Sequence, residues 1–150
     1  MGKLIKIKTS LIKPSQDFLK EKTIRHIGLL ILENKLNDLP PAPIIRKHPS
    51  KEGYIAIDGH NLLAVKDLLN EECEVYIADS SNDKLEKNNF PYSTDEALES
   101  RNKDLEEKFE TVLKDVDELA KKGVANFCDL RIKYEYLKNW ESLKIFIQNK

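Results

Sequence analysis

The sequence predicts an α/β fold of the α+β type, in which a small mixed sheet with helices is followed by a C-terminal helical extension. Three observations predict this class. Residues 54–77 have the pattern of a strand, a glycine turn, an apolar helix and a second strand, and residues 44–57 have the pattern of a hairpin. From residue 94 onward, apolar residues recur at alternating spacings of four and three, which is typical of helices.

The first elements expected are a strand and a helix. The strand covers residues 3–7, where Ile5 and Ile7 share a face, and Pro14 ends any continuation of it. Thr23 is the expected cap of the helix that follows, and Gly28 lies inside that helix at some cost in stability.

The central hairpin leads into a glycine turn. The prolines within residues 40–43 break the helix and force an extended approach, and the two strands of the hairpin deliver Asp58 to the turn. Gly59 permits a backbone conformation that other residues resist, and an apolar helix begins after it. The free N–H groups and positive dipole end of that helix predict an anion site above Gly59.

The second half predicts a linker and helices. We expect a domain over residues 1–79, a turn-rich linker over residues 80–93, and a helical extension over residues 94–150 that packs on the domain. One long helix is expected from Thr94 to Gly123, and Asp129 is expected to cap the first of two short helices near the C-terminus.

The apolar stripe of the long helix has two interpretations. It resembles the seam of a coiled coil, in which Asn102 would fix the register, and the chain would then be a homodimer. Leu113 and Ala120 widen the stripe beyond a two-helix seam, which favours packing within a monomer. The stripe consists of Leu98, Asn102, Leu105, Phe109, Val112, Val116 and Leu119.

Composition excludes several classes of function. The chain has 25 lysines and arginines against 26 aspartates and glutamates, so no overall positive field favours sequence-specific DNA binding. No apolar segment has the length of a membrane span or signal peptide, which predicts a cytoplasmic protein. The two cysteines, Cys73 and Cys128, lack the spacing of a zinc site or a disulfide framework, and no metal site is expected.

A local basic strip is the exception to this balance. Lysines crowd the first strand, and further cations flank the central hairpin. The favoured interpretation is a solvated sheet edge on which lysines block unwanted strand pairing. The strip consists of Lys3, Lys6, Lys8, Lys13, Arg46, Lys47 and Lys51.

Several segments together resemble the ParB/sulfiredoxin superfamily, in particular ParB-like proteins with an Asp-Gly-His turn. These segments are LIKPSQDFLKEK, LPPAPIIRKH, the turn of Asp58, Gly59 and His60, and GVANFCDLRIKYEY near the C-terminus. The resemblance covers roughly residues 4–79 and implies a sulfiredoxin-like fold that holds a nucleotide phosphate at the turn. The implied cofactor is ATP, ADP or CTP with Mg²⁺, bound by Ser15, Gln16, Gly59, His60, Asn61 and Leu62.

The same resemblance implies catalytic candidates, namely Asp17, Asp58 and His60. Asp58 would orient His60 or hold a metal with its phosphate, and His60 would donate to a phosphate or transfer a proton. Spacing alone favours the interpretation that Asp58 caps the helix and His60 is a surface residue of its first turn, and only the resemblance puts ligand binding level with it.

Two departures from the family pattern reduce the expected catalysis. Leu62 stands where the family has an arginine that grips phosphate, and Gln16 stands where kinase-like members have a glutamate. The sequence therefore predicts a ParB-like protein that binds a nucleotide or phosphate ligand, with weak or lost catalysis.

Two other functions stay open from the sequence. The first is a nucleotide-dependent phosphotransferase resembling free-serine kinases, or a nucleotidase or nuclease, with Asp17 as base and a first-strand lysine replacing the arginine. The second is a non-catalytic scaffold that binds a protein partner through its long helix.

Overall fold

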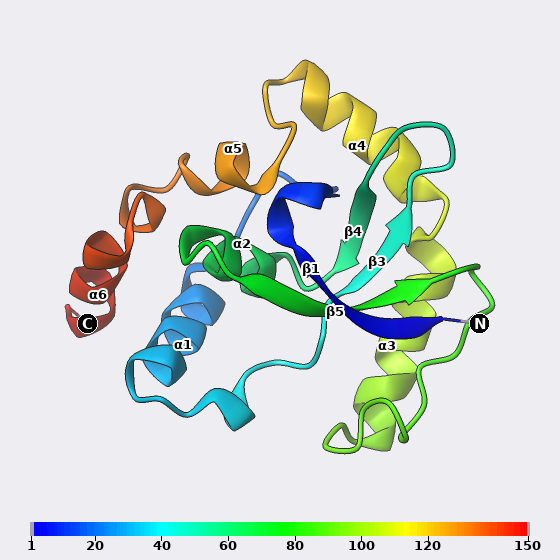
Figure 1. The fold of residues 1–150 in the computed structure, drawn as a ribbon, viewed down its shortest axis with the longest axis horizontal. Coiled ribbons are helices and arrows are strands. Elements are labelled where there is room, and N and C mark those ends of the chain that lie inside the picture. The colour runs from blue at the N-terminus through cyan, green and yellow to red at the C-terminus, as the bar shows by residue number, and fades with distance from the viewer. Residues whose placement is uncertain (1, 150) are drawn as a thin grey trace.

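The computed structural model describes residues 2–149, and it confirms the expected α+β class (Figure 1). The strands are β1 (Lys3–Lys8), β2 (Ile12–Lys13), β3 (Ile44–Lys47), β4 (Tyr54–Asp58) and β5 (Glu72–Ala78). The helices are α1 (Glu21–Leu32), α2 (His60–Leu68), α3 (Asp95–Lys108), α4 (Thr111–Lys121), α5 (Phe127–Arg131) and α6 (Trp140–Gln148). Short 3-10 turns cover Thr9–Leu11, Leu36–Asp38 and Glu135–Leu137.

The five strands form one mixed sheet in the order β1-β5-β3-β4-β2. β3 runs parallel to β5 and antiparallel to β4, with Ile44 opposite Asp58 and Lys47 opposite Tyr54. The carboxyl ends of β3 and β4 therefore lie at opposite ends of the strands in the sheet. β1 is an outer strand, and its antiparallel partner is β5.

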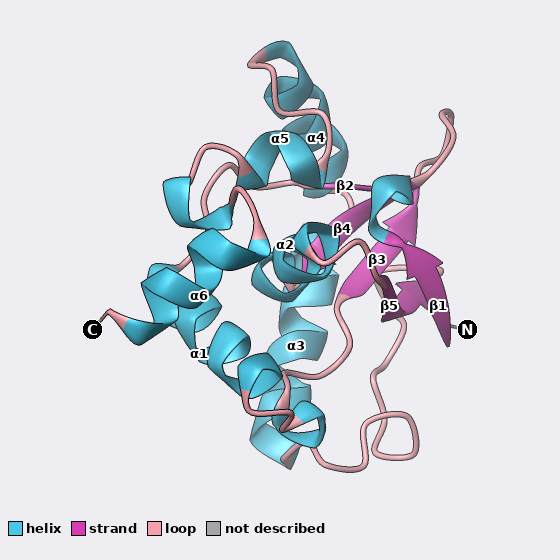
Figure 2. Ribbon diagram, turned by 60° about the vertical axis from the view of Figure 1, so that its left-hand side comes forward, coloured by secondary structure: helices cyan, strands magenta, loops and turns pink. Residues whose placement is uncertain are grey.

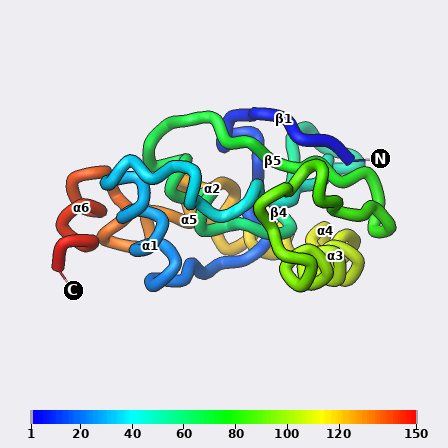
Figure 3. The backbone as a smooth tube through the Cα atoms, turned by 90° about the horizontal axis from the view of Figure 1, so that it is seen from below, coloured from blue at the N-terminus to red at the C-terminus, as the bar shows by residue number. Residues whose placement is uncertain are grey.

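Helices cover both faces of the sheet. Side chains alternate along β4, so that Ile55 and Ile57 join one core cluster and Ala56 joins the other. α3 and α4 pack on the first of these faces, and α2 packs on the second with α1, α5 and α6 around it. Figures 2 and 3 show α1 and α6 side by side at the end of the molecule away from β1. None of the helices within residues 2–149 has the length and apolar character needed to span a bilayer.

The first helix begins earlier than expected. α1 starts at Glu21 after Lys20, so the expectation of a Thr23 cap is wrong, and no side chain caps this helix. Gly28 has a packing reason, because a Cβ atom there would lie 2.5 Å from Cδ1 of Ile147 in α6. Glycine lowers the intrinsic stability of α1, but its missing side chain permits close contact with the C-terminal helix.

The long helix expected from Thr94 to Gly123 is broken at Phe109 and Glu110. In a continuous helix the carbonyl of Phe109 would accept the N–H of Leu113. Here Arg46 Nη1 donates to that carbonyl at 2.7 Å, and Leu113 N–H bonds to the Glu110 carbonyl instead. A side chain from β3 therefore divides the segment into α3 and α4.

The apolar stripe of α3 and α4 packs inside the chain. Leu105 is fully buried, Phe109 is 7% exposed, and both belong to the cluster beneath the sheet. Asn102 bonds to the backbone N–H and carbonyl of Leu85, which gives it a partner within the same chain. Leu85 and Phe90 are also buried, so the turn-rich segment over residues 80–93 is anchored to this core.

Asn126, rather than Asp129, caps α5. The Asn126 side chain accepts the N–H of Asp129, and the Asp129 carboxylate accepts the N–H of Ala125. The expected cap is therefore wrong by three residues. The sequence still indicated the right motif, because the side chains of Asn126 and Asp129 both take part in it.

We predict that replacing Leu105 and Phe109 together with glutamate unfolds the protein. Each truncation of a large buried side chain costs about 2–5 kcal/mol, and the new carboxylates lack partners in the core. Circular dichroism during urea unfolding measures the loss. The matched variant Ala97→Glu/Ser100→Glu adds the same charge at exposed positions of α3 and should fold normally. A folded Leu105→Glu/Phe109→Glu variant would contradict internal packing.

Candidate functional site

The turn between β4 and α2 is tightly packed against the segment that leads into β3. Gly59 has φ of 91°, in the left-handed region that side chains rarely adopt. A Cβ atom at Gly59 would also lie 2.6 Å from Cβ of Pro43. The backbone conformation at residue 59 and the contact with Pro43 before β3 therefore both require glycine. No ligand is needed to explain it.

His60 is held in the interior as a neutral ring. It is 4% exposed, and its Nε2 atom accepts the backbone N–H of Ser15 at 3.0 Å. Its ring centroid lies 5.7 Å from that of Phe127 in α5. Burial lowers the pKa of His60 to about 4, although Asp58 opposes this shift. At neutral pH the ring thus has no proton to give from Nε2.

Asp58 is paired with an arginine that the sequence did not suggest. Arg101 Nε lies 2.9 Å from Asp58 Oδ2, and Arg101 Nη2 donates to the carbonyl of Ala42 at 2.6 Å. The other oxygen of Asp58 accepts the N–H of Gly59. Arg101 Nη1 is buried, and within residues 2–149 it has no hydrogen-bond partner. Arg101 lies in α3, 43 residues from Asp58, so no local motif could identify it.

Ser15, His60 and Asp58 are not arranged as a nucleophilic triad. Ser15 Oγ donates to the carbonyl of Ala56 at 2.6 Å, so its proton is directed away from His60 Nε2 at 3.3 Å. Both oxygens of Asp58 are taken by other donors. A triad needs a base that receives the nucleophile's proton and an acid that orients the base, and neither link is present. This arrangement favours a structural role for the three residues.

The remaining predicted residues surround the turn without converging on one point. Asn61 Oδ1 accepts the N–H of Lys20, which ties the loop before α1 to α2. Gln16 donates to the carbonyl of Phe18, and Asp17 is exposed in the same loop. Leu62 is 6% exposed and belongs to the main core cluster. The hydrogen bonds and ion pairs among described residues do not connect Asp17 to Asp58 or His60.

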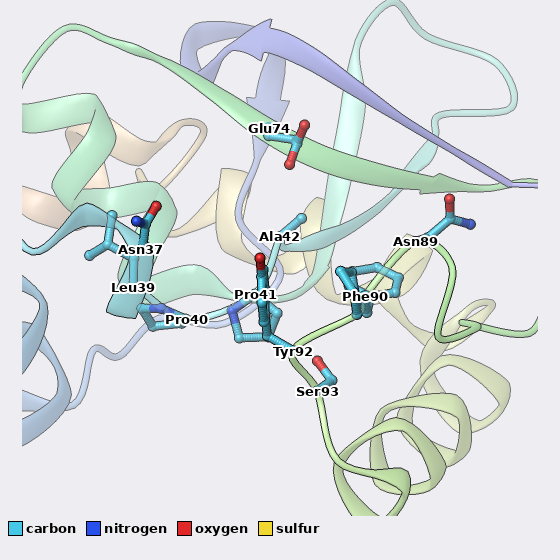
Figure 4. Close-up of a pocket in the computed structure, with 11 residues that line it drawn as sticks. Asn37, Leu39, Pro40, Pro41, Ala42, Glu74, Asn89, Phe90, Tyr92 and Ser93 are labelled. Carbon is cyan, nitrogen blue, oxygen red and sulfur yellow. The ribbon is translucent and has the colours of Figure 1, made fainter.

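A groove lies beside the turn and is formed by two adjoining pockets of about 400 Å³ each. Both are lined by Leu39, Pro40, Ala42 and Glu74. Figure 4 shows the first pocket, whose walls come from the loop before β3, from β5 and from the segment that carries Phe90 and Tyr92. The second pocket reaches Leu62 and is lined by Lys6, Lys66 and Glu72 among others. We call the two pockets together the proline groove.

The charged residues of the proline groove define what it could hold. Lys6 on β1 and Lys66 on α2 supply cations near Leu62, and sequence reasoning had proposed a first-strand lysine for this purpose. Glu72 and Glu74 are two residues apart on β5 and therefore share a face. No group of three or more metal-ligating side chains occurs among the described residues. Mg²⁺ bound together with phosphate needs only one or two carboxylates from the protein.

No protein-family model matches this chain, and no curated protein matches its sequence. The resemblance to the ParB/sulfiredoxin superfamily therefore stays a prediction.

Replacing Leu62 with arginine, which would restore the family pattern, should destabilise the fold. The guanidinium would enter a core site in which Leu62 is 6% exposed, and an unpaired buried charge costs several kcal/mol. The matched variant Leu62→Met conserves volume and should cost less than about 1.5 kcal/mol. Urea unfolding of both variants measures the difference. Equal stability of the two variants would show that an arginine at position 62 extends into the proline groove and stays solvated.

Stability should fall with acid because of His60. The folded state lowers the pKa of His60 from 6.5 to about 4, so the unfolded chain binds the proton more tightly. Above about pH 6.5, His60 is neutral in both states and does not reduce the free energy of unfolding. As the pH falls from about 6.5 to about 4, the unfolding free energy decreases by about 3 kcal/mol because of this residue.

The variant His60→Gln removes this ionisation and should show a shallower loss of unfolding free energy over the same pH interval. Denaturant unfolding at several pH values measures both proteins. Identical pH dependence in the two proteins would mean that His60 is not buried in neutral form.

Proposed function

We propose that this protein binds a nucleotide or another phosphate-bearing small molecule in the proline groove, with weak or lost catalysis. The observation that carries the proposal is the continuity of two unlike pockets. One is lined by prolines and Phe90, and the other carries Lys6 of β1 and Lys66 of the last turn of α2. A flat apolar group and a phosphate require these two environments at adjacent positions.

The phosphate end of the groove is supported by charge and position. The side chain of Lys66 is 21% exposed, and its ammonium pairs at 3.3 Å with Glu71, whose side chain is 55% exposed. Lys6 stands on the outer strand β1 opposite Glu74 of β5. A phosphate group between the two lysines would gain charge-assisted hydrogen bonds. Glu72 or Glu74 would then complete the coordination of a Mg²⁺ ion that accompanies the phosphate.

The apolar end is supported by its rigid walls. Pro40 and Pro41 have fixed backbone geometry, and Phe90 is 4% exposed with its ring 5.8 Å from that of Tyr76. Tyr92 is 97% exposed at the opening of the groove and therefore has freedom to pack against a ligand. Aromatic and proline walls of this kind suit a flat ring such as a nucleobase.

The alternatives have weaker support in the geometry. A phosphotransferase, nucleotidase or nuclease needs a base near the phosphate, whereas no hydrogen bond or ion pair among the described residues joins Asp17 to the turn, and His60 is buried as a neutral ring. A scaffold that binds a partner through the long helix would offer only the polar side of α3 and α4, because their apolar stripe is buried. We propose a cytoplasmic location, which suits the unpaired thiols of Cys73 and Cys128.

We predict that ATP, ADP or CTP with Mg²⁺ raises the melting temperature, since a ligand that binds only the folded state stabilises it. The variant Lys6→Gln/Lys66→Gln should weaken nucleotide binding by about tenfold to hundredfold, the range for hydrogen bonds to charged groups. Calorimetry measures the affinity. The control Lys22→Gln changes one charge at an exposed position of α1 and should bind like the parent. Equal affinity of the double variant and the parent would refute binding in this groove.

A further inference from the structure

A second pocket of interest lies at the edge of the sheet opposite the Asp58 turn. β3 and β5 run parallel, so their carboxyl ends meet at this edge, next to the start of β4 at Tyr54. The pocket there has a volume of about 440 Å³ and lies between the central hairpin, the end of β5 and Phe109. In Figure 1 this edge lies beyond the arrowheads of β3 and β5. We call it the hairpin pocket.

A buried arginine forms part of its wall. Arg46 is 8% exposed and stacks on the ring of Phe109, with Cζ 3.9 Å from the ring centroid. Its Nη1 and Nε atoms donate to the carbonyls of Phe109 and Lys47. The nearest carboxylate, Glu110, lies 3.8 Å away on a side chain that is 75% exposed. Arg46 is thus a fixed cation whose charge is only partly compensated by protein groups.

One edge of the guanidinium remains available. Nη2 of Arg46 has no hydrogen-bond partner among the described residues, and it is not among their buried unpaired atoms. This nitrogen therefore reaches solvent while the rest of the group is held in place. A planar donor immobilised in this way loses little entropy when it binds an anion.

His48 adds a second fixed donor. Its Nδ1 atom accepts the N–H groups of Ser50 and Lys51 at 3.1 and 3.0 Å, so the ring proton is located on Nε2. Burial, together with the charge of Lys51, lowers the pKa of His48 and keeps the ring neutral. Nε2 is not among the buried unpaired atoms of the described residues and so reaches solvent as a donor.

The remaining polar lining is mostly cationic. Lys3 and Lys47 are exposed at the start of β1 and the end of β3, and Tyr54 also lines the pocket. Among the described residues that line the pocket, Asp79 is the single carboxylate, against the three cations Lys3, Arg46 and Lys47. Protection of a sheet edge explains exposed lysines. The contacts with Phe109 explain why Arg46 is buried, but neither explanation uses Nη2 of Arg46 or Nε2 of His48, both of which reach solvent.

We propose that the hairpin pocket binds the phosphate group of a small phosphate monoester, held by Arg46, His48, Lys3 and Lys47. The pocket is larger than a phosphate ion, and Tyr54 with the apolar end of β5 leaves room for the ester group. This site is separate from the proline groove, because no residue lines both. It does not depend on the function proposed above.

The test uses inorganic phosphate and phenyl phosphate as probes in a titration followed by backbone amide NMR. The expected result is saturable movement of the amide signals of Lys47, His48, Ala78 and Phe109 with both probes. Tighter binding of phenyl phosphate would assign the site to esters, and equal binding would overturn the part of the proposal that concerns the ester group. Signals that move only at the start of α2, or nowhere at millimolar probe, would overturn the site itself.

The variant Lys3→Gln/Lys47→Gln removes the two exposed cations and leaves the buried groups intact. Its affinity for phenyl phosphate should fall by about tenfold or more, as expected for lost hydrogen bonds to charged groups. The control Lys20→Gln/Lys22→Gln makes the same charge change before and within α1, and should bind like the parent. Equal affinity of the two variants would overturn the proposal, because binding would then follow net charge or another site.

Discussion

The conformation of Gly59 is the constraint on which the arrangement of the central elements depends. Its φ of 91° lets α2 begin one residue after β4 ends, and contact with Pro43 leaves no space for a side chain. Because the helix starts so abruptly, His60 is directed inward, where Ser15 donates to its ring. The loop before α1, the proline segment and the central strand are all positioned by this one turn.

Arginine side chains connect the sheet to the helices on its first face in a reciprocal manner. Arg101 extends from α3 to the carbonyl of Ala42 before β3, and Arg46 extends from β3 to the carbonyl of Phe109 between α3 and α4. Guanidinium groups suit this role because they provide several donors in a fixed plane. On the other face, Arg131 of α5 pairs with Asp67 of α2 at 3.0 Å. Charged anchors thus supplement apolar packing at each junction.

The strand directions determine where ligands have access. The end of β4 is closed by Pro43 and by the loop before α1, and the space beside the turn that the described residues enclose lies along the proline groove. At the other end of these strands, β3 turns back into β4 and β5 continues into the segment before α3, and the hairpin pocket lies there. The two candidate sites are therefore chemically different. The proline groove lies near the starts of β3 and β5, and the hairpin pocket lies near the ends of the same strands. In the first, apolar walls adjoin mixed charges, and in the second, donors and cations predominate.

The sequence alone determined the element types, because periodicity and glycine or proline positions act locally. The alternation in Tyr54–Asp58, the apolar stripe after Gly59 and the widened stripe of α3 and α4 were sufficient for the strands, the helices and the α+β class. The same local signals located the turn and its polar residues Asp58 and His60, whereas Ser15 was named through the resemblance to the ParB/sulfiredoxin superfamily. They also indicated internal packing of the long helical segment.

The tertiary structure alone decided how those residues are connected. The break at Phe109 depends on Arg46, which is 63 residues away, and the burial of His60 depends on the amide of Ser15, which is 45 residues away. Arg101 reaches Asp58 across 43 residues. Partners at such separations follow from the way the helices pack on the sheet, and no spacing in the sequence encodes them. The chemistry of Asp58 and His60 was therefore decided by contacts that exist only in the folded chain.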